Sequence, residues 1–139
     1  MKALVVKPVK VAAGLVFKDG KLLIAKRPEN SHLGGMWEFP GGKLEFGESY
    51  EICLKREIKE ELGVKIKVGY EFEEVLHRYS EKTVLIKFFI CSLSSGNPKT
   101  IQCSEFQWIN RRDLTRYNFP AADIKVINQL RLNNNIWNK

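Results

Sequence analysis

Three glutamates of this sequence, Glu57, Glu60 and Glu61, are spaced so that one face of a helix would carry all three. At about 100° per residue they fall within an arc of roughly 100°, directly beside the apolar residues Leu54 and Ile58. Like charges three or four residues apart cost about 0.2–0.5 kcal/mol per pair, so something must compensate for them. Carboxylate oxygens are suitable ligands for Mg²⁺ and Mn²⁺, and a bound cation would remove the repulsion. The spacing is therefore compatible with a metal site at the border of a buried helix face.

The residues around these glutamates form a longer pattern. Taken alone, the acids and the lysines between them fit a salt-bridged helix surface better than a metal site. However, Gly42, five residues, Glu48, seven residues and then residues 56–64 (REIKEELGV) agree at every constrained position with GX5EX7REUXEEXGU, where U is aliphatic. This motif is the Nudix box, and the chain resembles the Nudix hydrolases through it. The longer pattern favours the metal site.

The resemblance extends beyond the box. Residues 37–43 (WEFPGGK) are similar to the run before the box in the MutT-like branch, and residues 119–123 (FPAAD) are similar to its nucleobase-contacting segment. The order of expected elements agrees with the family from about residue 9 to residue 130. The resemblance implies one α/β (α+β) domain over residues 1–139, with the Nudix fold, an α/β/α sandwich around a mixed sheet.

The resemblance also implies roles for the residues of the box. Glu57, Glu60 and Glu61 would hold Mg²⁺, with Mn²⁺ as the alternative, and the backbone carbonyl of Gly41 would be a further ligand. A pair of glycines lets the backbone approach an ion closely, although a simple turn is the other explanation for it. Arg56 would orient a box glutamate through a charge-assisted hydrogen bond.

Several residues outside the box are candidates for contacts with a nucleotide. Arg27 matches a phosphate-contacting arginine of the MutT-like branch, and Lys43 could support the same charge. His32 matches a position near the nucleotide. Each of these three is otherwise an ordinary surface residue. Phe39 and Phe119 are expected to form an apolar slot for a base, unless the two rings belong to the core.

Asp123 is the candidate for recognition of the base. An ionised carboxylate only accepts hydrogen bonds, so it should favour a base edge with N–H groups, as in cytosine, guanine or 8-oxoguanine. Capping of the last helix is the alternative role of this residue.

The general base is expected from a departure from the family pattern. Relatives often carry a glutamate six residues before the tryptophan that matches Trp108, where this chain has Gln102. Because an amide cannot take up a proton, we expect the base to be a box glutamate or Glu105, the nearest carboxylate.

The expected elements place these residues at the ends of strands and on one helix. Turn residues between residues 9–17 and 22–25 predict a hairpin, and residues 40–42 (PGG) predict a turn. Ser49 as N-cap and Gly63 as C′ residue bracket a helix. Further strands are expected at 64–77, 83–93 and 105–110. A final helix should open at residues 119–121, with its apolar residues Ile124, Ile127, Leu130 and Leu132 near helical spacing, and residues 133–139 are expected to fray.

Composition limits the remaining possibilities. The chain has 139 residues, with 23 Lys and Arg against 16 Asp and Glu, and so a net charge of +7. This length suits one domain, and no apolar run is long enough to span a bilayer. Cys53, Cys91 and Cys103 show no CxxC spacing, so we expect a reducing, cytoplasmic environment rather than disulfides or a zinc site. No targeting segment is expected, because Lys7 and Lys10 interrupt the apolar stretch at the N-terminus.

The resemblance implies a metal-dependent pyrophosphohydrolase that converts a nucleoside triphosphate to the monophosphate and pyrophosphate. The substrate could be an oxidised nucleotide such as 8-oxo-dGTP, or CTP or dCTP. Dinucleoside polyphosphates, nucleotide sugars and RNA 5′ ends are alternative substrates, and a non-catalytic nucleotide-binding regulator is an alternative of another class. The positive charge leaves nucleic acid open as a partner, although no basic motif interleaved with aromatic residues is present. Monomer and homodimer both remain open.

Overall fold

The expected hairpin forms the centre of the sheet in the computed structural model, which describes residues 7–138. Strand β1 (Val9–Lys18) and strand β2 (Lys21–Lys26) are joined by Asp19 and Gly20, whose φ angles of 51° and 76° suit a tight two-residue turn. The prediction that no targeting segment is present concerns mainly residues 1–6, which lie outside the described residues. Within residues 7–138, no helix is long and apolar enough to cross a membrane.

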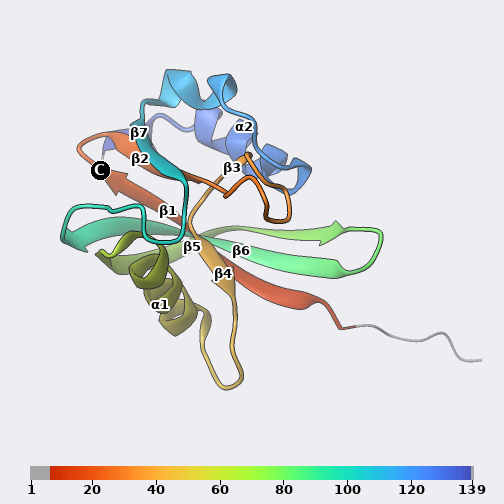
Figure 1. Cartoon of the computed structure of the whole chain (residues 1–139). Coiled ribbons are helices and arrows are strands. Elements are labelled where there is room, and N and C mark those ends of the chain that lie inside the picture. The colour runs from red at the N-terminus through yellow and green to blue at the C-terminus, as the bar shows by residue number, and fades with distance from the viewer. Residues whose placement is uncertain (1–6, 139) are drawn as a thin grey trace, which may run out of the picture.

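The described residues form a mixed sheet of seven strands (Figure 1). Strands β1 and β6 run parallel, and the other paired strands run antiparallel. The sheet order is β3 (Trp37–Glu38), β2, β1, β6 (Thr83–Ser95) and β5 (Lys65–Arg78), with β4 (Gly41–Lys43) on β1 and β7 (Glu105–Ile109) on β2. The mixed sheet implied by the resemblance is confirmed.

The glycine pair at the start of the box lies in a strand, so the turn predicted at residues 40–42 is wrong. Gly41 and Gly42 pair with Ala13 and Ala12 of β1, whereas the end of β1 pairs with β2. One edge of β1 is therefore shared between two strands that diverge. The Gly14 N–H donates to the Pro40 carbonyl at 2.8 Å where they separate. Backbone pairing with a distant strand has overridden the local preference for a turn.

Helix α1 (Tyr50–Leu62) covers one face of the sheet and begins and ends where the sequence predicted. The Ser49 hydroxyl accepts a hydrogen bond from the Ile52 N–H at 3.2 Å, and Gly63 has a φ angle of 69°. The buried residues of the helix share one stripe, which consists of Cys53, Leu54, Ile58 and Leu62. Burial of this stripe fixes the rotation of the helix, and so the direction of the neighbouring glutamates.

The opposite face of the sheet is covered by α2 (Ile124–Leu132) and three short 3₁₀ turns, η1 (Arg111–Arg116), η2 (Ala121–Asp123) and η3 (Asn135–Asn138) (Figure 1). Two helical layers thus enclose the sheet, and the expected α/β/α sandwich is confirmed. Helix α2 begins after the 3₁₀ turn, later than predicted, and buries Val126, Ile127 and Leu130. Ile124 and Leu132, which share the helical spacing, are exposed.

The C-terminal segment packs onto the domain, and the prediction that it frays is wrong for the described residues. Ile136 and Trp137 are buried in the same core as α2. The Trp137 indole N–H donates to the Leu130 carbonyl at 2.9 Å, and its ring lies 5.2 Å from the Phe17 ring. Two apolar side chains close to the end of an Asn-rich stretch are sufficient to hold it.

We expect Trp137→Ala to lower the free energy of unfolding by about 3–5 kcal/mol, because it removes a buried ring and a hydrogen bond. Urea denaturation measures this change. Leu132→Ala is the matched control, since Leu132 is 86% exposed and its truncation should be nearly neutral. An unchanged stability of Trp137→Ala would contradict the docking of the C-terminal turn.

Candidate functional site

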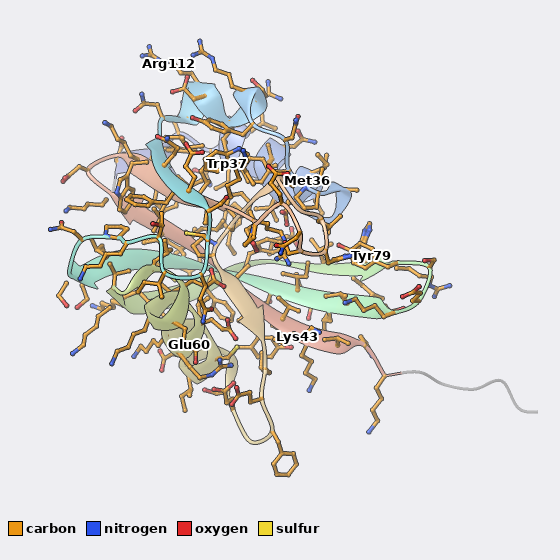
Figure 2. The ribbon with its side chains drawn as sticks, in the orientation of Figure 1. Met36, Trp37, Lys43, Glu60, Tyr79 and Arg112 are labelled. Carbon is orange, nitrogen blue, oxygen red and sulfur yellow. The ribbon has the colours of Figure 1, made fainter. Side chains whose placement is uncertain are left out.

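A cavity of about 460 Å³ lies where β4 separates from β2. Its lining combines residues from β1, the loop 27–36, β4, α1, the β5–β6 turn and η2. Most of the residues expected at the site meet there, namely Arg27, His32, Phe39, Gly41, Lys43, Glu57, Glu61 and Asp123. Figure 2 shows Lys43 on β4, Tyr79 at the end of β5 and Glu60 on α1, while Arg112 lies far away on η1. Segments distant in sequence thus supply one cavity.

Arg56 lies at the centre of the acidic helix face. Its guanidinium donates to the Glu48 carboxylate at 2.7 and 2.9 Å, to Glu57 at 2.8 Å and to Glu60 at 3.3 Å. It also donates to the carbonyl of Lys43 at 3.2 Å. The bond with Arg56 lowers the pKa of Glu48 to about 2. The expected charge-assisted bond to a box glutamate is therefore present, and Glu48 anchors the arginine that makes it.

The glycine pair brings backbone close to the box glutamates. A β-carbon at Gly42 would overlap the Glu57 carboxylate, and one at Gly41 would overlap the Ala12 carbonyl. Only glycine allows β4 to pass between β1 and α1 at this separation. The backbone of β4 is therefore held beside a carboxylate, as a shared ion would require.

Three carboxylates near this strand lie in partly or largely dehydrated positions, those of Glu38, Glu57 and Glu61. Loss of water raises the pKa of Glu61 to about 9, and the nearby charges of Glu38 and Glu57 add to the shift. Burial also raises the pKa of Glu57 and of Glu38, against the opposing effect of the adjacent arginines. Additional positive charge would favour the ionised form of each of these carboxyl groups, so the donor set fits a hard divalent cation.

The carboxylates do not yet converge on one point. Among residues 7–138, no three acid, histidine or cysteine side chains are grouped as a metal centre. Glu57 and Glu60 are turned toward Arg56, and the Glu60 side chain is 46% exposed and outside the cavity lining. A cation would therefore have to draw these side chains away from the arginine.

Arg27 and Glu38 form an ion pair in the cavity wall. The Arg27 guanidinium donates to the Glu38 carboxylate at 3.0 and 3.2 Å and to the His32 carbonyl at 2.6 Å. Sequence reasoning did not select Glu38, because a single acid before Phe39 has no informative spacing. Tyr79 and Lys82 also line the cavity and were also missed, because only the β5–β6 turn brings them there.

Asp123 is buried at 8% exposure in the cavity wall. Its side chain makes no capping hydrogen bond to α2, so the helix-cap alternative is wrong. Burial raises its pKa to about 7, with a smaller contribution from the charge of Glu38. Phe39 and Phe119 stack at 5.1 Å and both belong to the core, and Phe39 also lines the cavity.

Glu105 is not brought to the cavity. It is exposed on β7, where its carboxylate accepts a hydrogen bond from Gln107 at 3.1 Å. Gln102 contributes its backbone, since the N–H groups of Ile101 and Gln102 both donate to the Glu61 carbonyl at 3.1 Å. The loop that contains Gln102 therefore caps the end of α1 beside Glu61.

The chain is similar to several known proteins along most of its length. A NUDIX domain model matches residues 12–129. An 8-oxo-dGTP diphosphatase of Proteus vulgaris is 40% identical over 85 residues, which cover 60% of this chain and 76% of that protein. A CTP pyrophosphohydrolase of Escherichia coli (strain K12) is 33% identical over 124 residues, covering 87% of this chain and 90% of that protein. The crystal structure of a MutT protein from Methanosarcina mazei Go1 has a TM-score of 0.81 at 25% identity, covering 91% of this chain and 96% of that one. The chain therefore belongs to the Nudix hydrolase family.

Proposed function

We propose that the chain hydrolyses a nucleoside triphosphate to the monophosphate and pyrophosphate. The observation that carries the proposal is one cavity with acid groups and a glycine strand on one side and a buried Asp123 on the other. The first part suits a phosphate chain with its cations, and the second suits a nucleobase. The relatives named as 8-oxo-dGTP diphosphatase and CTP pyrophosphohydrolase support the same reaction.

Nudix hydrolases in general depend on a divalent metal ion. In this chain we propose that Glu57, Glu60, Glu61 and the Gly41 carbonyl hold Mg²⁺, with Mn²⁺ as a substitute. When bound, the ion would neutralise the phosphate oxygens and the leaving pyrophosphate. Arg56 would keep Glu57 and Glu60 close to their positions and prevent their mutual repulsion from spreading the helix end.

A box glutamate is the proposed general base. Glu57 lines the cavity, has a raised pKa and lies against the Gly42 backbone, so it could take a proton from an attacking water. Glu105, the other candidate from the sequence, is exposed outside the cavity lining. Lys43 lines the cavity and forms no ion pair within the described residues, which leaves its charge available to phosphate.

Asp123 is the proposed reader of the base. Its carboxyl is buried, and its pKa of about 7 allows both protonation states near neutral pH. A base edge that donates hydrogen bonds would favour the ionised form. The edges of guanine, 8-oxoguanine and cytosine carry exocyclic or ring N–H groups that can donate in this way. Thymine and uracil offer fewer such donors.

A panel of normal and oxidised nucleoside triphosphates, with products identified by mass, tests the proposed function. We expect monophosphate and pyrophosphate, formed fastest from guanine, 8-oxoguanine or cytosine nucleotides. Faster turnover of dinucleoside polyphosphates, nucleotide sugars or triphosphorylated RNA would replace the proposed substrate class. Absence of turnover with every compound in Mg²⁺ would favour a nucleotide-binding regulator.

Glu57→Gln and Glu60→Gln should each lower kcat by about 10²-fold or more while the chain remains folded, because each removes a charged metal ligand. Pyrophosphate release measures activity, and circular dichroism checks the fold. Glu51→Gln, on the first turn of the same helix, is the matched control and should leave the rate unchanged. Nearly normal turnover of both glutamate variants would contradict the metal site.

Asp123→Asn should change how stability depends on pH. The carboxyl has a pKa of about 7 in the folded chain against 3.8 as its ordinary value, so the wild type loses stability as pH rises from about 4 to about 7. The loss is at most about 1.4 kcal/mol per pH unit. Urea denaturation at pH 5 to 8 should show that the stability of the variant relative to the wild type increases up to about pH 7 and then stays constant. Asp19→Asn, at an exposed position in the hairpin turn, serves as control, and a difference independent of pH would refute the assignment.

A further inference from the structure

Arg27 is the residue on which the loop 27–36 closes. This loop connects β2 to β3 and forms one wall of the cavity. The Arg27 N–H donates to the Met36 carbonyl at 2.9 Å, and the Arg27 carbonyl accepts from the Gly35 N–H at 3.1 Å. Its guanidinium reaches the middle of the loop, at the His32 carbonyl, and the cavity wall, at Glu38. The backbone of Arg27 therefore joins the two ends of the loop, and its side chain joins this end to the tip and to Glu38.

The conformation of the loop requires such restraint. Leu33 lines the cavity with a φ angle of 56°, in the left-handed region that residues with a β-carbon rarely adopt. A β-carbon at Gly34 would overlap the Glu29 carbonyl, so the loop is also tightly folded. A backbone in this conformation persists when surrounding bonds hold it.

The tip of the loop meets the opposite side of the cavity. The His32 ring lies edge-on to the Tyr79 ring at 5.5 Å, and Tyr79 in turn contacts His77 at 4.6 Å. Since His32, Leu33 and Tyr79 all line the cavity, the position of the loop sets the width of the space open to a base.

The same bonds engage one edge of the Arg27 guanidinium in the wall of the cavity. Its Nε and Nη1 donors are already used by His32 and Glu38. Turning the guanidinium toward a phosphate would leave the Glu38 carboxylate in a dehydrated position without its counter-ion. The contacts therefore add a structural role for Arg27 to the phosphate-binding role that the family resemblance implied, which stays a prediction.

We propose that Arg27 and Glu38 are a positioning pair, which holds the loop 27–36 against Tyr79 and thereby determines which nucleobases enter the cavity. The inference rests on the proposed function, because it assigns base selectivity to the same site. Removal of a positioning residue should change KM and the selectivity between bases, whereas removal of a phosphate ligand should lower activity equally for all nucleotides.

The test compares Arg27→Gln, Glu38→Gln and the double variant on the two nucleotides that the wild type distinguishes best. We expect the ratio of their kcat/KM values to fall about tenfold, mainly through KM, with the double variant no worse than the worse single one. Arg27→Lys should keep only part of the wild-type selectivity, because an ammonium group cannot make the planar, forked set of hydrogen bonds that a guanidinium makes. Arg116→Gln, which removes a surface arginine paired with Asp113, is the matched control and should change nothing.

Hydrogen exchange without nucleotide gives a second readout. The N–H groups of Gly34, Gly35 and Met36 should exchange faster in Arg27→Gln and Glu38→Gln than in the wild type, at an unchanged melting temperature of the core. An equal loss of kcat/KM for every nucleotide, with unchanged exchange in the loop, would overturn the inference and leave the proposed hydrolysis intact. If the wild type hydrolyses no nucleotide, the proposed function fails, while the exchange experiment still tests the pair.

Discussion

Arg56 makes the acidic face of α1 possible. Four glutamates lie within reach of its guanidinium, and without a central cation their repulsion would oppose both the helix and its packing on the sheet. The same arginine bonds the Lys43 carbonyl, so it also ties β4 to the helix. Local charge balance and the placement of the strand therefore depend on one residue.

The divided edge of β1 converts this arrangement into a cavity. Because β4 takes the first half of the edge and β2 the second, side chains of α1 and of the opposite helical layer can line the same space. The two core clusters on either side of the sheet hold these layers at fixed separation. Packing on both faces of the sheet thus determines the geometry of the cavity, and the loop 27–36 forms one of its walls.

The carboxylates around the site differ in the way their charge is compensated. The bond with Arg56 lowers the pKa of Glu48 to about 2, whereas Glu61 has no ion-pair partner among residues 7–138 and loss of water raises its pKa to about 9. Asp123 lies between these extremes. Of these three, Glu61 and Asp123 line the cavity, and carboxylates with perturbed pKa values in a cleft are candidates for binding and catalytic roles.

The amino-acid sequence alone determined the features that depend on neighbours a few residues away. The spacing of Glu57, Glu60 and Glu61, the caps at Ser49 and Gly63, and the hairpin turn are such features, because bonds within one turn produce them. Other features depend on contacts between distant segments, and only the tertiary structure decided them. Gly41 joined a strand instead of a turn, Trp137 docked instead of fraying, and Asp123 faced the cavity instead of capping its helix. Glu38 and Tyr79 became part of the site for the same reason: burial and pairing energies between distant segments exceed local preferences, and a sequence shows the preferences but not the neighbours.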